Sequence, residues 1–434
     1  MTKNRYIAHI VIEADTPIKV GSNANDFIQD APVQKDWNGL PMILGTSIAG
    51  VLRKDFNDKK VFGFQEGENA EGSKVILSNA LLIGDNGKVY EELLLDKSEN
   101  KIFSLFNNLP IREHTAINSK GVTSSGAKFD EEVVYKGTRF KFSIEFIEEQ
   151  KEIFESILNI LSNSAFRLGG GSTKGFGKFK IIEIKTGLVD LENYSSSLNR
   201  SEVLTSHNCE AKASIPKKHT TYTLKIKPND FFMFGSGFGD SDADMTPVFE
   251  KVVDYNINDL STKQVLIPAS SIKGALAHRT TYHFNKLKGN TIEAKNGVET
   301  IDVIFGHKKE LDKNTEKELG QKGKILISDC FKSFDEDKQT KTFDHVSIDR
   351  FTGGAIEGAL FNEKTVVDDG EAYTIEILLE KNIEKIYIDA FESALKDITT
   401  GMLPLGGATT KGHGVFKGCV KDENGNIIIG KCDE

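Results

Sequence analysis

The sequence is poor in the residues that build covalent or metal-linked frameworks. Its 434 residues include four cysteines, nine prolines and one tryptophan. Cys209, Cys330, Cys419 and Cys432 form no CxxC pair and have no histidine at ligand spacing. This pattern argues against a zinc site and against a disulfide framework. We therefore expect four reduced thiols.

Long apolar runs and an excess of basic residues are also missing. No hydrophobic segment approaches the length of a membrane span, and the chain begins directly with an alternating strand pattern instead of a signal-like segment. The expectation is a soluble, cytoplasmic protein with no membrane partner. A net charge of −9 disfavours nonspecific nucleic-acid binding, because counterion release requires lysine and arginine. A local basic groove stays compatible with this charge.

Five sequence blocks occur twice in the same order. The glycine-rich blocks, RLGGGSTKGFGKF at 167–179 and PLGGATTKGHGVF at 404–416, align without a gap. Chance similarity would not keep five blocks in order, so the sequence predicts a duplication. The predicted domains are 1–190 and 216–434, and the serine- and asparagine-rich residues 191–215 between them are the predicted linker.

Each copy combines strand and helix patterns. Alternating apolar residues predict strands, for example in YIAHIVIEA and TYTLKIK. The blocks GTSIAGVLR and PASSIKGALAHR predict helices, which we expect to be capped by the hydroxyls of Ser47 and of Ser270 or Ser271. The order strand, helix, strands, strand, helix, strand is typical of an α+β unit of the split βαβ kind.

The glycine loops are the strongest local candidates for ligand binding. Glycines allow close approach of another backbone, and free N–H groups beside Lys174 or Lys411 would form an anion site suited to phosphates. The pattern matches neither a P-loop nor a dinucleotide fingerprint, because the lysine precedes the second glycine group and a helix precedes the loop. A plain tight turn from helix to strand is the alternative interpretation.

The predicted helix starts are a second candidate for phosphate binding. Exposed N–H donors and a partial positive charge gather at a helix N-terminus. Simple N-capping is the alternative interpretation. The polar residues at these two starts are Ser47, Arg53, Ser271, Lys273 and Arg279.

Acidic loops after the opening strands are a third candidate. Carboxylates on a flexible loop can hold a divalent cation or act as a base beside a phosphodiester, although solvated loops are the commoner case. His114 and His345 match between the copies, but nothing in their spacing makes them ligands or bases. The carboxylates are Asp26, Asp30 and Asp36 in the first copy and Asp240, Asp242 and Asp244 in the second.

Together, the ordered blocks resemble the RAMP superfamily of CRISPR-associated proteins, in particular the backbone subunits of type III effector complexes. The motifs that carry the resemblance are ILGTSIAGVLR, IPASSIKGALAHR, SIDRFTGGAIEGALFNEKTV and the two glycine loops. The match covers nearly the whole chain outside the linker. It implies an α+β fold of two tandem ferredoxin-like (RRM-like) domains with inserted hairpins and C-terminal glycine-rich loops.

The resemblance also implies roles for particular residues. In the family, an Asp two residues before Pro cuts target RNA with a divalent metal, which places that role and the metal, Mg²⁺ or Mn²⁺, on Asp30 of DAPV. The second copy has Met245 at this position, so Asp244 or Asp242 would have to act there. The implied RNA-binding residues are Ser47, Arg53, Lys174, Ser271, Lys273, Arg279 and Lys411.

The resulting expectation is a crRNA-binding subunit that cleaves complementary target RNA by metal-dependent endoribonuclease chemistry. Its expected partners are crRNA, target RNA and the other subunits of a type III CRISPR ribonucleoprotein in antiviral defence. Two alternatives stay open. One is a structural crRNA-binding subunit that cuts nothing, and the other is a metal-independent crRNA-maturation endoribonuclease with His9 or His114 as general base.

Overall fold

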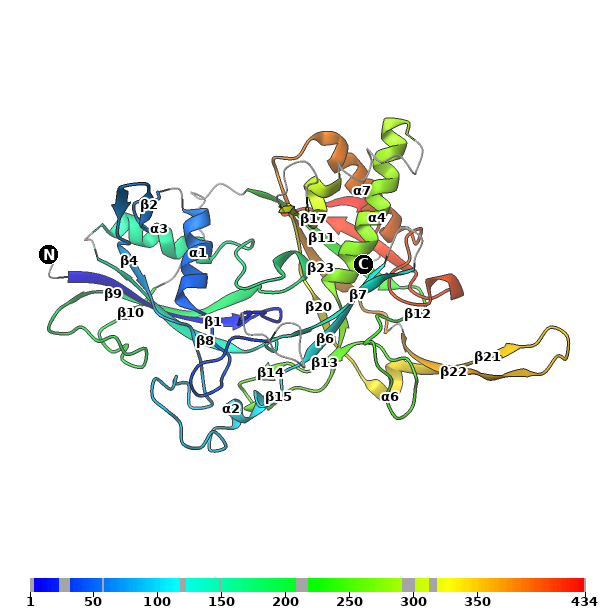
Figure 1. Ribbon diagram of the computed structural model, residues 1–434, viewed down its shortest axis with the longest axis horizontal. Helices are drawn as coiled ribbons and strands as arrows, with labels where there is room; N and C mark the ends of the chain where they lie inside the picture. Colours follow the sequence, from blue (N-terminus) through cyan, green and yellow to red (C-terminus); the bar gives the residue numbers. More distant parts are fainter. Residues whose placement is uncertain are drawn as a thin grey trace.

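The computed structural model describes residues 4–22, 32–56, 58–117, 122–147, 150–207, 218–290, 301–311, 318–367 and 369–432. We call the residues up to 207 the first module and those from 218 the second module. The two modules lie side by side and give the molecule an elongated shape (Figure 1). No helix in these ranges is both long enough and apolar enough to cross a membrane.

The first module is built on an antiparallel sheet in the order β10, β9, β1, β8 and β4, with β5 also paired to β8. Helices α1 and α3 cover one face of it (Figure 1). The elements are β1 (Asn4–Ala14), α1 (Gly45–Asp55), β2 (Phe64–Glu66), β3 (Asn69–Glu71), β4 (Val75–Leu77), β5 (Leu81–Leu82), α2 (Lys101–Leu105), β6 (Ile111–Ile117), β7 (Thr123–Glu132), β8 (Arg139–Phe146), α3 (Lys151–Leu161), the 3₁₀ turn η1 (Ser172–Lys174), β9 (Phe179–Asp190) and β10 (Thr205–Ser206).

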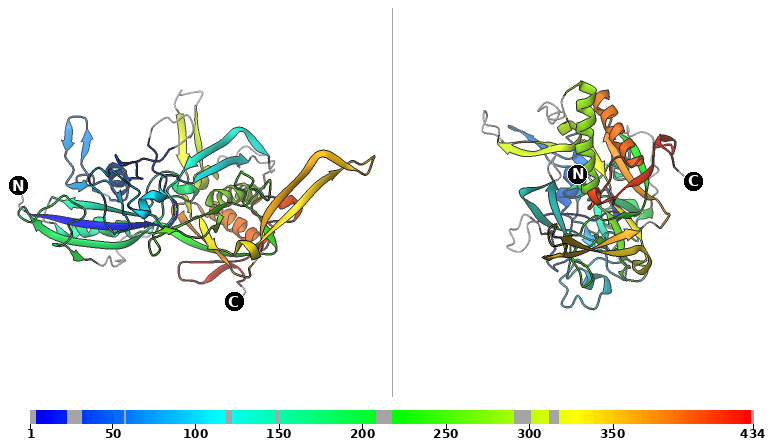
Figure 2. Two further views of the ribbon diagram at one scale, coloured as in Figure 1. Left: turned by 90° about the horizontal axis from the view of Figure 1, so that it is seen from below. Right: turned by 90° about the vertical axis from the view of Figure 1, so that its right-hand side faces the viewer.

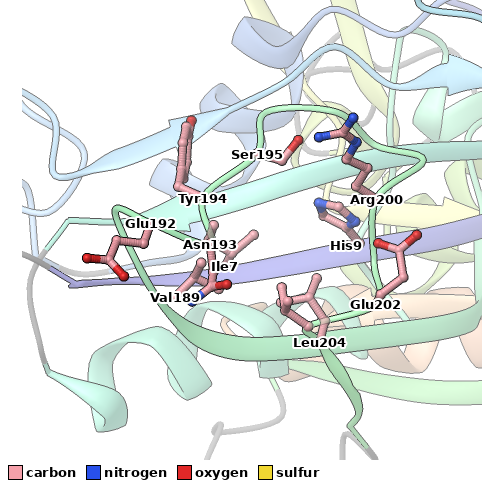
Figure 3. Close-up of a pocket in the computed structure, with 11 residues that line it drawn as sticks. Ile7, His9, Val189, Glu192, Asn193, Tyr194, Ser195, Arg200, Glu202 and Leu204 are labelled. Carbon is pink, nitrogen blue, oxygen red and sulfur yellow. The ribbon is translucent and has the colours of Figure 1, made fainter.

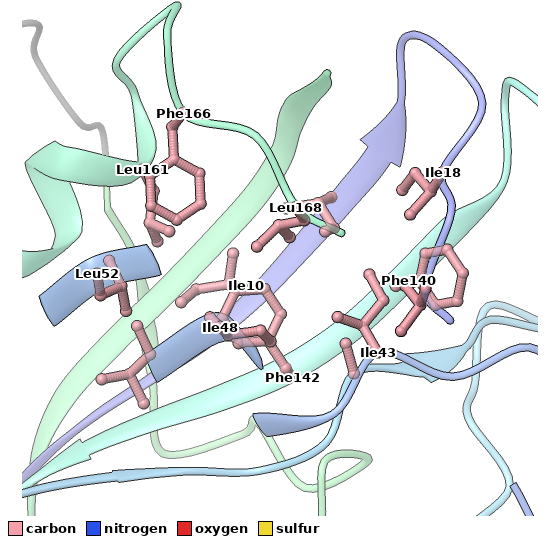
Figure 4. Close-up of a cluster of buried hydrophobic side chains, with 14 of the residues drawn as sticks. Ile10, Ile18, Ile43, Ile48, Leu52, Phe140, Phe142, Leu161, Phe166 and Leu168 are labelled. Atoms are coloured by element: carbon pink, nitrogen blue, oxygen red, sulfur yellow. The ribbon is translucent and has the colours of Figure 1, made fainter. Parts of the chain in front are cut away.

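The core of the first module follows from the period of two in β1. Ile10 and Ile12 point to the face covered by α1 and α3 and are fully buried. Figure 4 shows Ile10 among Ile48 and Leu52 of α1 and Phe142 of β8. Each large apolar side chain buried in this way contributes roughly 1.5–3 kcal/mol to folding.

The opposite face of β1 is covered by a segment that the sequence assigned to the linker. β10 of this segment pairs with β9, and Leu204 packs with Ile7 and Val189. Asn199 Oδ1 accepts a hydrogen bond of 3.1 Å from the backbone of Val89. Residues 191–207 therefore lie against the first sheet, and the domain limits given above stay predictions.

The second module repeats this plan with the sheet order β19, β23, β11, β24 and β25. The elements are β11 (His219–Pro228), β12 (Phe231–Phe232), β13 (Phe249–Glu250), β14 (Val253–Asp254), β15 (Asp259–Leu260), β16 (Gln264–Ile267), α4 (Ala269–Lys288), β17 (Gly306–Leu311), β18 (Glu318–Lys322), β19 (Ile325–Ile327), β20 (Cys330–Ser333), α6 (Glu336–Gln339), β21 (Thr340–Ile348), β22 (Ala355–Val367), β23 (Tyr373–Glu380), α7 (Lys385–Thr399), η2 (Thr409–Lys411), β24 (Phe416–Lys421) and β25 (Ile427–Gly430).

The two sheets share one strand order. The run β9, β1, β8, β4 in the first corresponds to β24, β11, β23, β19 in the second, so the opening strand lies between the last strand and the one before the second helix. Helices α4 and α7 pack against each other in the second module, as Figure 1 shows. This mixed α+β architecture confirms the predicted class and is consistent with ferredoxin-like units.

Each module carries a long hairpin. In the first module β6 pairs with β7, and in the second β21 pairs with β22. The β6–β7 hairpin lies against the second module, whereas the β21–β22 hairpin extends away from the body of the molecule (Figure 2). The two copies of the same element therefore have different surroundings.

A buried ionic group joins the modules through the first hairpin. Arg112 of β6 donates to both carboxylate oxygens of Glu250 at 2.5 and 2.9 Å and to Asp329 Oδ2 at 2.5 Å. All three side chains are buried. Burial disfavours the guanidinium charge, but the Asp329 and Glu250 carboxylates outweigh it and raise the pKa of Arg112. We call these three residues the junction triad.

The cysteines differ from the expectation. Cys419 and Cys432 form a disulfide, with their Cα atoms 5.0 Å apart, so the prediction of four reduced thiols is wrong for this pair. The cause is the pairing of β24 with β25, which places Cys419 opposite Gly430 and brings the following residues close to it. Cys330 is free and buried, and Cys209 lies outside the described residues.

Candidate nucleic-acid interface

Both glycine loops fold into the same short turn. Each forms one 3₁₀ turn between two residues in the left-handed region, which favours glycine. In the first loop Ser172–Lys174 lies between Gly171 (φ 70°) and Gly175 (φ 110°), and in the second Thr409–Lys411 lies between Ala408 (φ 53°) and Gly412 (φ 95°). The turn presents Lys174 and Lys411 at equivalent positions.

A buried glutamate lies beneath the first loop lysine. Glu131 of β7 accepts a hydrogen bond of 2.5 Å from Lys19 Nζ, and Lys174 Nζ lies 3.5 Å from the same oxygen. His114 Nε2 lies 3.2 Å from the other oxygen of Glu131. The Lys174 amine also lies 4.7 Å from the centre of the Phe129 ring, on which the His114 ring stacks.

The second module repeats this arrangement. Glu363 of β22 lies 3.2 Å from His345 Nε2 and 3.7 Å from Lys411 Nζ. The Lys411 amine is 4.8 Å from the centre of the Phe361 ring, and the His345 ring stacks on it. His413 adds a second imidazole, 3.6 Å from Glu363. We call the repeated Phe, His, Glu and Lys group the loop cluster of each module.

The electrostatics of Glu131 explain why a carboxylate is retained there. Burial raises the pKa of Glu131, but the neighbouring His114 and Lys19 donors and the charge of Lys174 outweigh burial and lower it to about 2. Glu131 is therefore ionised at neutral pH and fixes the position of Lys174.

Sequence reasoning identified the lysines of the loop clusters and noted that His114 and His345 match without giving them a role, but it missed the glutamates. The available signal was the alignment of Phe129-Asp130-Glu131 with Phe361-Asn362-Glu363, each about 17 residues after the matching histidine. Alternation along a strand then places Phe and Glu on one side of the hairpin, where the loop lysine reaches both.

The first glycine loop also faces the start of α4 in the second module. Lys273 Nζ donates to Thr173 Oγ1 at 3.3 Å. Burial and the charge of Lys174 lower the pKa of Lys273 to about 8, so the two amines lie close enough to repel each other. Ser271, two residues before Lys273 in α4, is exposed. The structure thus brings together Lys174 and Lys273, two amines that an anion between them would stabilise.

Other predicted RNA-binding residues do not join this group. Arg279 forms an ion pair of 2.5 Å with Asp397 of α7, and Arg53 is exposed in the last turn of α1. Ser47 is partly buried near the start of α1. Lys411 belongs to the second loop cluster.

The helix caps differ from the prediction. Helices α1 and α4 have no side-chain cap from a hydroxyl, so the expected capping by Ser47 and by Ser270 or Ser271 is wrong. The caps come from distant residues instead. Asn79 Oδ1 accepts from the backbone of Gly45 at 2.9 Å, and Asp329 Oδ1 accepts from that of Ala269 at 2.8 Å.

The acidic loop of the second module is neutralised by a lysine. Lys364 Nζ lies 2.7 Å from Asp240 and 3.6 Å from Asp242. Asp244 Oδ2 accepts a hydrogen bond from the backbone of Asn362 at 3.0 Å. Across the described ranges, no group of three or more His, Cys, Asp or Glu side chains could hold a metal ion. These carboxylates therefore do not fit a metal site as they stand.

The first module has a glutamate where the second has Lys364, and this Glu132 lies 3.8 Å from Lys35. Glu132 comes directly after the buried glutamate, and its Oε2 accepts from the backbone of Val33 at 2.8 Å. Asp30, the predicted catalytic residue and metal ligand, lies outside the described residues, as does Asp26. The contact at Val33 fixes the chain three residues after Asp30 beside Glu132.

His9, one of the two bases considered for crRNA maturation, is not accessible. Its side chain lies on the face of β1 that residues 191–207 cover, beside a cavity of about 200 Å³ (Figure 3). Its exposed fraction is 3%, and its Nδ1 lies 2.8 Å from Ser201 Oγ. Burial and the charge of Lys141 lower the pKa of His9 to about 4. The other candidate, His114, is held by Glu131 and Phe129.

Comparison with known proteins gives the class of this chain. The sequence model of the RAMP superfamily matches residues 11–180 and 212–417, which are the two copies of the repeat. The chain belongs to the RAMP superfamily. Among individual relatives, it is similar to the CRISPR system Cms endoribonuclease Csm3 of Methanocaldococcus jannaschii, with 27% identity over 230 residues that cover 45% of this chain and 86% of the relative.

Proposed function

We propose that this chain is a crRNA-binding backbone subunit of a type III CRISPR effector complex. Its two modules would be tandem ferredoxin-like domains, and its partners would be crRNA, complementary target RNA and the other subunits of a cytoplasmic ribonucleoprotein. Membership of the RAMP superfamily and the similarity to a Csm3 protein support this proposal. The observation that carries it is the contact of Lys273 in α4 with Thr173 of the first glycine loop, beside Lys174.

The two amines of Lys174 and Lys273 favour binding of a phosphate backbone over binding of a base. Two amines that repel each other are stabilised by an anion between them. Phosphate contacts position a strand without reading its sequence, so base pairing with the guide would supply specificity. The excess of acidic residues elsewhere would keep unrelated RNA away.

The test of RNA binding compares Lys174→Gln/Lys273→Gln with the matched variant Lys88→Gln/Lys101→Gln, which also removes two exposed or partly exposed charges. RNA of defined length should copurify with the wild-type protein and its genomic neighbours. The logarithm of the RNA-binding constant falls linearly with the logarithm of the salt concentration. Loss of two phosphate contacts should make this slope for single-stranded RNA smaller in magnitude by about 1.4, at about 0.7 per phosphate. Equal slopes for both variants would contradict the proposed contact.

We further propose that the first module cleaves target RNA and that the second does not. The name of the Csm3 relative supports an RNA-cleaving role. The difference between Glu132 and Lys364 supports the assignment to the first module, because Lys364 occupies the carboxylates of the second module's loop whereas the first module has no lysine at that position. Asp30 is the proposed catalytic residue, with Mg²⁺ or Mn²⁺.

Asp30→Ala and Asp244→Ala in the reconstituted complex separate these assignments. We expect Asp30→Ala to abolish one defined cut of the target RNA while assembly and crRNA content stay unchanged, and Asp244→Ala to leave every cut in place. EDTA should stop cleavage. Unchanged cleavage by Asp30→Ala would leave a structural, noncatalytic crRNA-binding subunit as the function.

If the chain instead matured crRNA without a metal, EDTA would not stop cleavage, because a general base cuts the precursor without a divalent cation. The burial of His9 beneath residues 191–207 counts against this alternative.

A further inference from the structure

A groove of about 680 Å³ lies between the modules and includes part of the first glycine loop. Gly169 and Ser172 line it, but Lys174 and Lys273 do not. Helix α1 and the residues around β11, β19 and β23 form its other walls. Its basic side chains are Lys54, Arg167, Lys218, Lys322, Lys324 and Lys381. Two carboxylates, Asp55 and Glu380, oppose them, so the groove is positively charged in a protein of net charge −9.

Three of the groove lysines are available for a ligand. Lys54, Lys322 and Lys381 form no ion pair with any residue that the structure describes, whereas Lys218 lies 3.7 Å from Asp55. Lys54 and Lys322 both line the groove, and burial and the charge of Lys54 lower the pKa of Lys322, although Glu380 and Asp55 partly oppose this effect. Arg167 is held in place, since its guanidinium contacts Ser328 and Glu376.

The lining also indicates which chemistry fits. None of the described lining residues is Phe, Tyr or Trp, and the one ring among them is the imidazole of His219, so the groove offers little surface for stacking nucleobases. The space is far larger than the roughly 30 Å³ that a water molecule occupies, so a single small anion would not fill it. Lysine amines without an ion pair, contributed by both modules, can contact several consecutive phosphate groups.

We infer that this groove binds the phosphate groups of an extended phosphate ligand, held between Lys54 of the first module and Lys322 and Lys381 of the second. The inference extends the proposed RNA-binding role by a site that is separate from the Lys174 and Lys273 contact. Two sources share this chemistry, a segment of an RNA strand and a free nucleoside triphosphate. Simultaneous contact with both modules would also hold them in one relative position.

The test uses the full chain, the variant Lys54→Gln/Lys322→Gln and the control Lys88→Gln/Lys101→Gln. Binding of single-stranded RNA is measured between about 50 and 200 mM salt, and ATP binding is measured separately by calorimetry. If the ligand is RNA, the groove variant should bind it about tenfold more weakly near 0.15 M salt, with a slope lower by about 1.4, and the control should match the wild type. If the ligand is a nucleotide, only the ATP affinity of the groove variant should fall.

Chemical protection gives a second readout that does not depend on affinity. Acetylation of Lys54 and Lys322, followed by mass spectrometry, should slow severalfold when the occupying ligand is present, whereas Lys88 should react at an unchanged rate. The groove site would be overturned if the wild type binds RNA and the groove variant binds both RNA and ATP as the wild type does. The proposed function would then still stand. Failure of the wild type to bind RNA in any form would overturn the proposed function, and the ATP arm would then decide the groove alone.

Discussion

Glu131 is the buried charge on which the first loop lysine depends. Its pKa, lowered to about 2 from 4.5, means that ionised Glu131 contributes about 3 kcal/mol to the free energy of unfolding at neutral pH. Because the pKa is lower in the folded state, this contribution is complete above pH 4.5 and disappears as the pH falls through 2. Glu131→Gln should therefore destabilise the protein by about 3 kcal/mol at pH 7, and by less than half of that at about pH 3.

Urea unfolding at both pH values measures this difference. Glu68→Gln is the matched control, because Glu68 is exposed and its loss should change little at either pH. A loss for Glu131→Gln that is the same at pH 7 and pH 3 would show that Glu131 acts through packing and not through its charge.

Among single residues, the sequence revealed those that glycine-rich or repeated motifs mark. Lys174 and Lys411 stand in such motifs and occupy equivalent positions in the structure. Glu131 stands in an ordinary strand, and only the folded hairpin brings it to Lys174. The predicted role of Asp30 stays a prediction.

The glycine loops offer a comparison between two copies of one element. A Cβ atom on Gly175 would lie 2.2 Å from Asp329 Oδ1 and 2.7 Å from Ala269 Cβ, whereas on Gly412 it would meet nothing within 4 Å. Alanine at either position costs about 1–2 kcal/mol for the left-handed backbone. Gly175→Ala should cost about 1–3 kcal/mol more, because it also disturbs the contact with α4.

Thermal unfolding of the two variants isolates this extra cost, since the backbone strain is common to both. Equal losses of stability for Gly175→Ala and Gly412→Ala would mean that the first loop is not held against the second module in solution.

Elements were predictable where the period of apolar residues determines them. The alternation in β1 and the apolar face of α3 were visible because one side of each is buried in the same core. The caps by Asn79 and Asp329 and the Cys419–Cys432 disulfide join residues that only the folded chain places together. Local sequence contains no sign of them.

At the scale of the whole molecule, the junction triad makes unfolding of one module depend on the other. Arg112→Met leaves the Glu250 and Asp329 carboxylates buried without their cation, which costs about 3–5 kcal/mol. We expect the single unfolding transition of the wild type to separate into two in this variant. Differential scanning calorimetry measures the change.

Two further variants control for the loss of an arginine and for the buried charges. Arg53→Met removes an exposed guanidinium and should leave one transition. Combining Arg112→Met with Glu250→Gln and Asp329→Asn removes all three charges and should restore much of the lost stability. A single, unshifted transition in Arg112→Met would show that the triad does not couple the modules.

The glycine loop of the second module has open space beside Gly412, so the two ends of the molecule differ. Inside the molecule, the loop of the first module meets the helix start of the second, so this type of contact always joins two unlike surfaces. The second loop, beside Gly412, and the start of α1, which corresponds to that of α4, belong to different modules. Copies that joined through these surfaces would meet head to tail and form a ring or an open row, because a contact between unlike surfaces does not close into a symmetric pair.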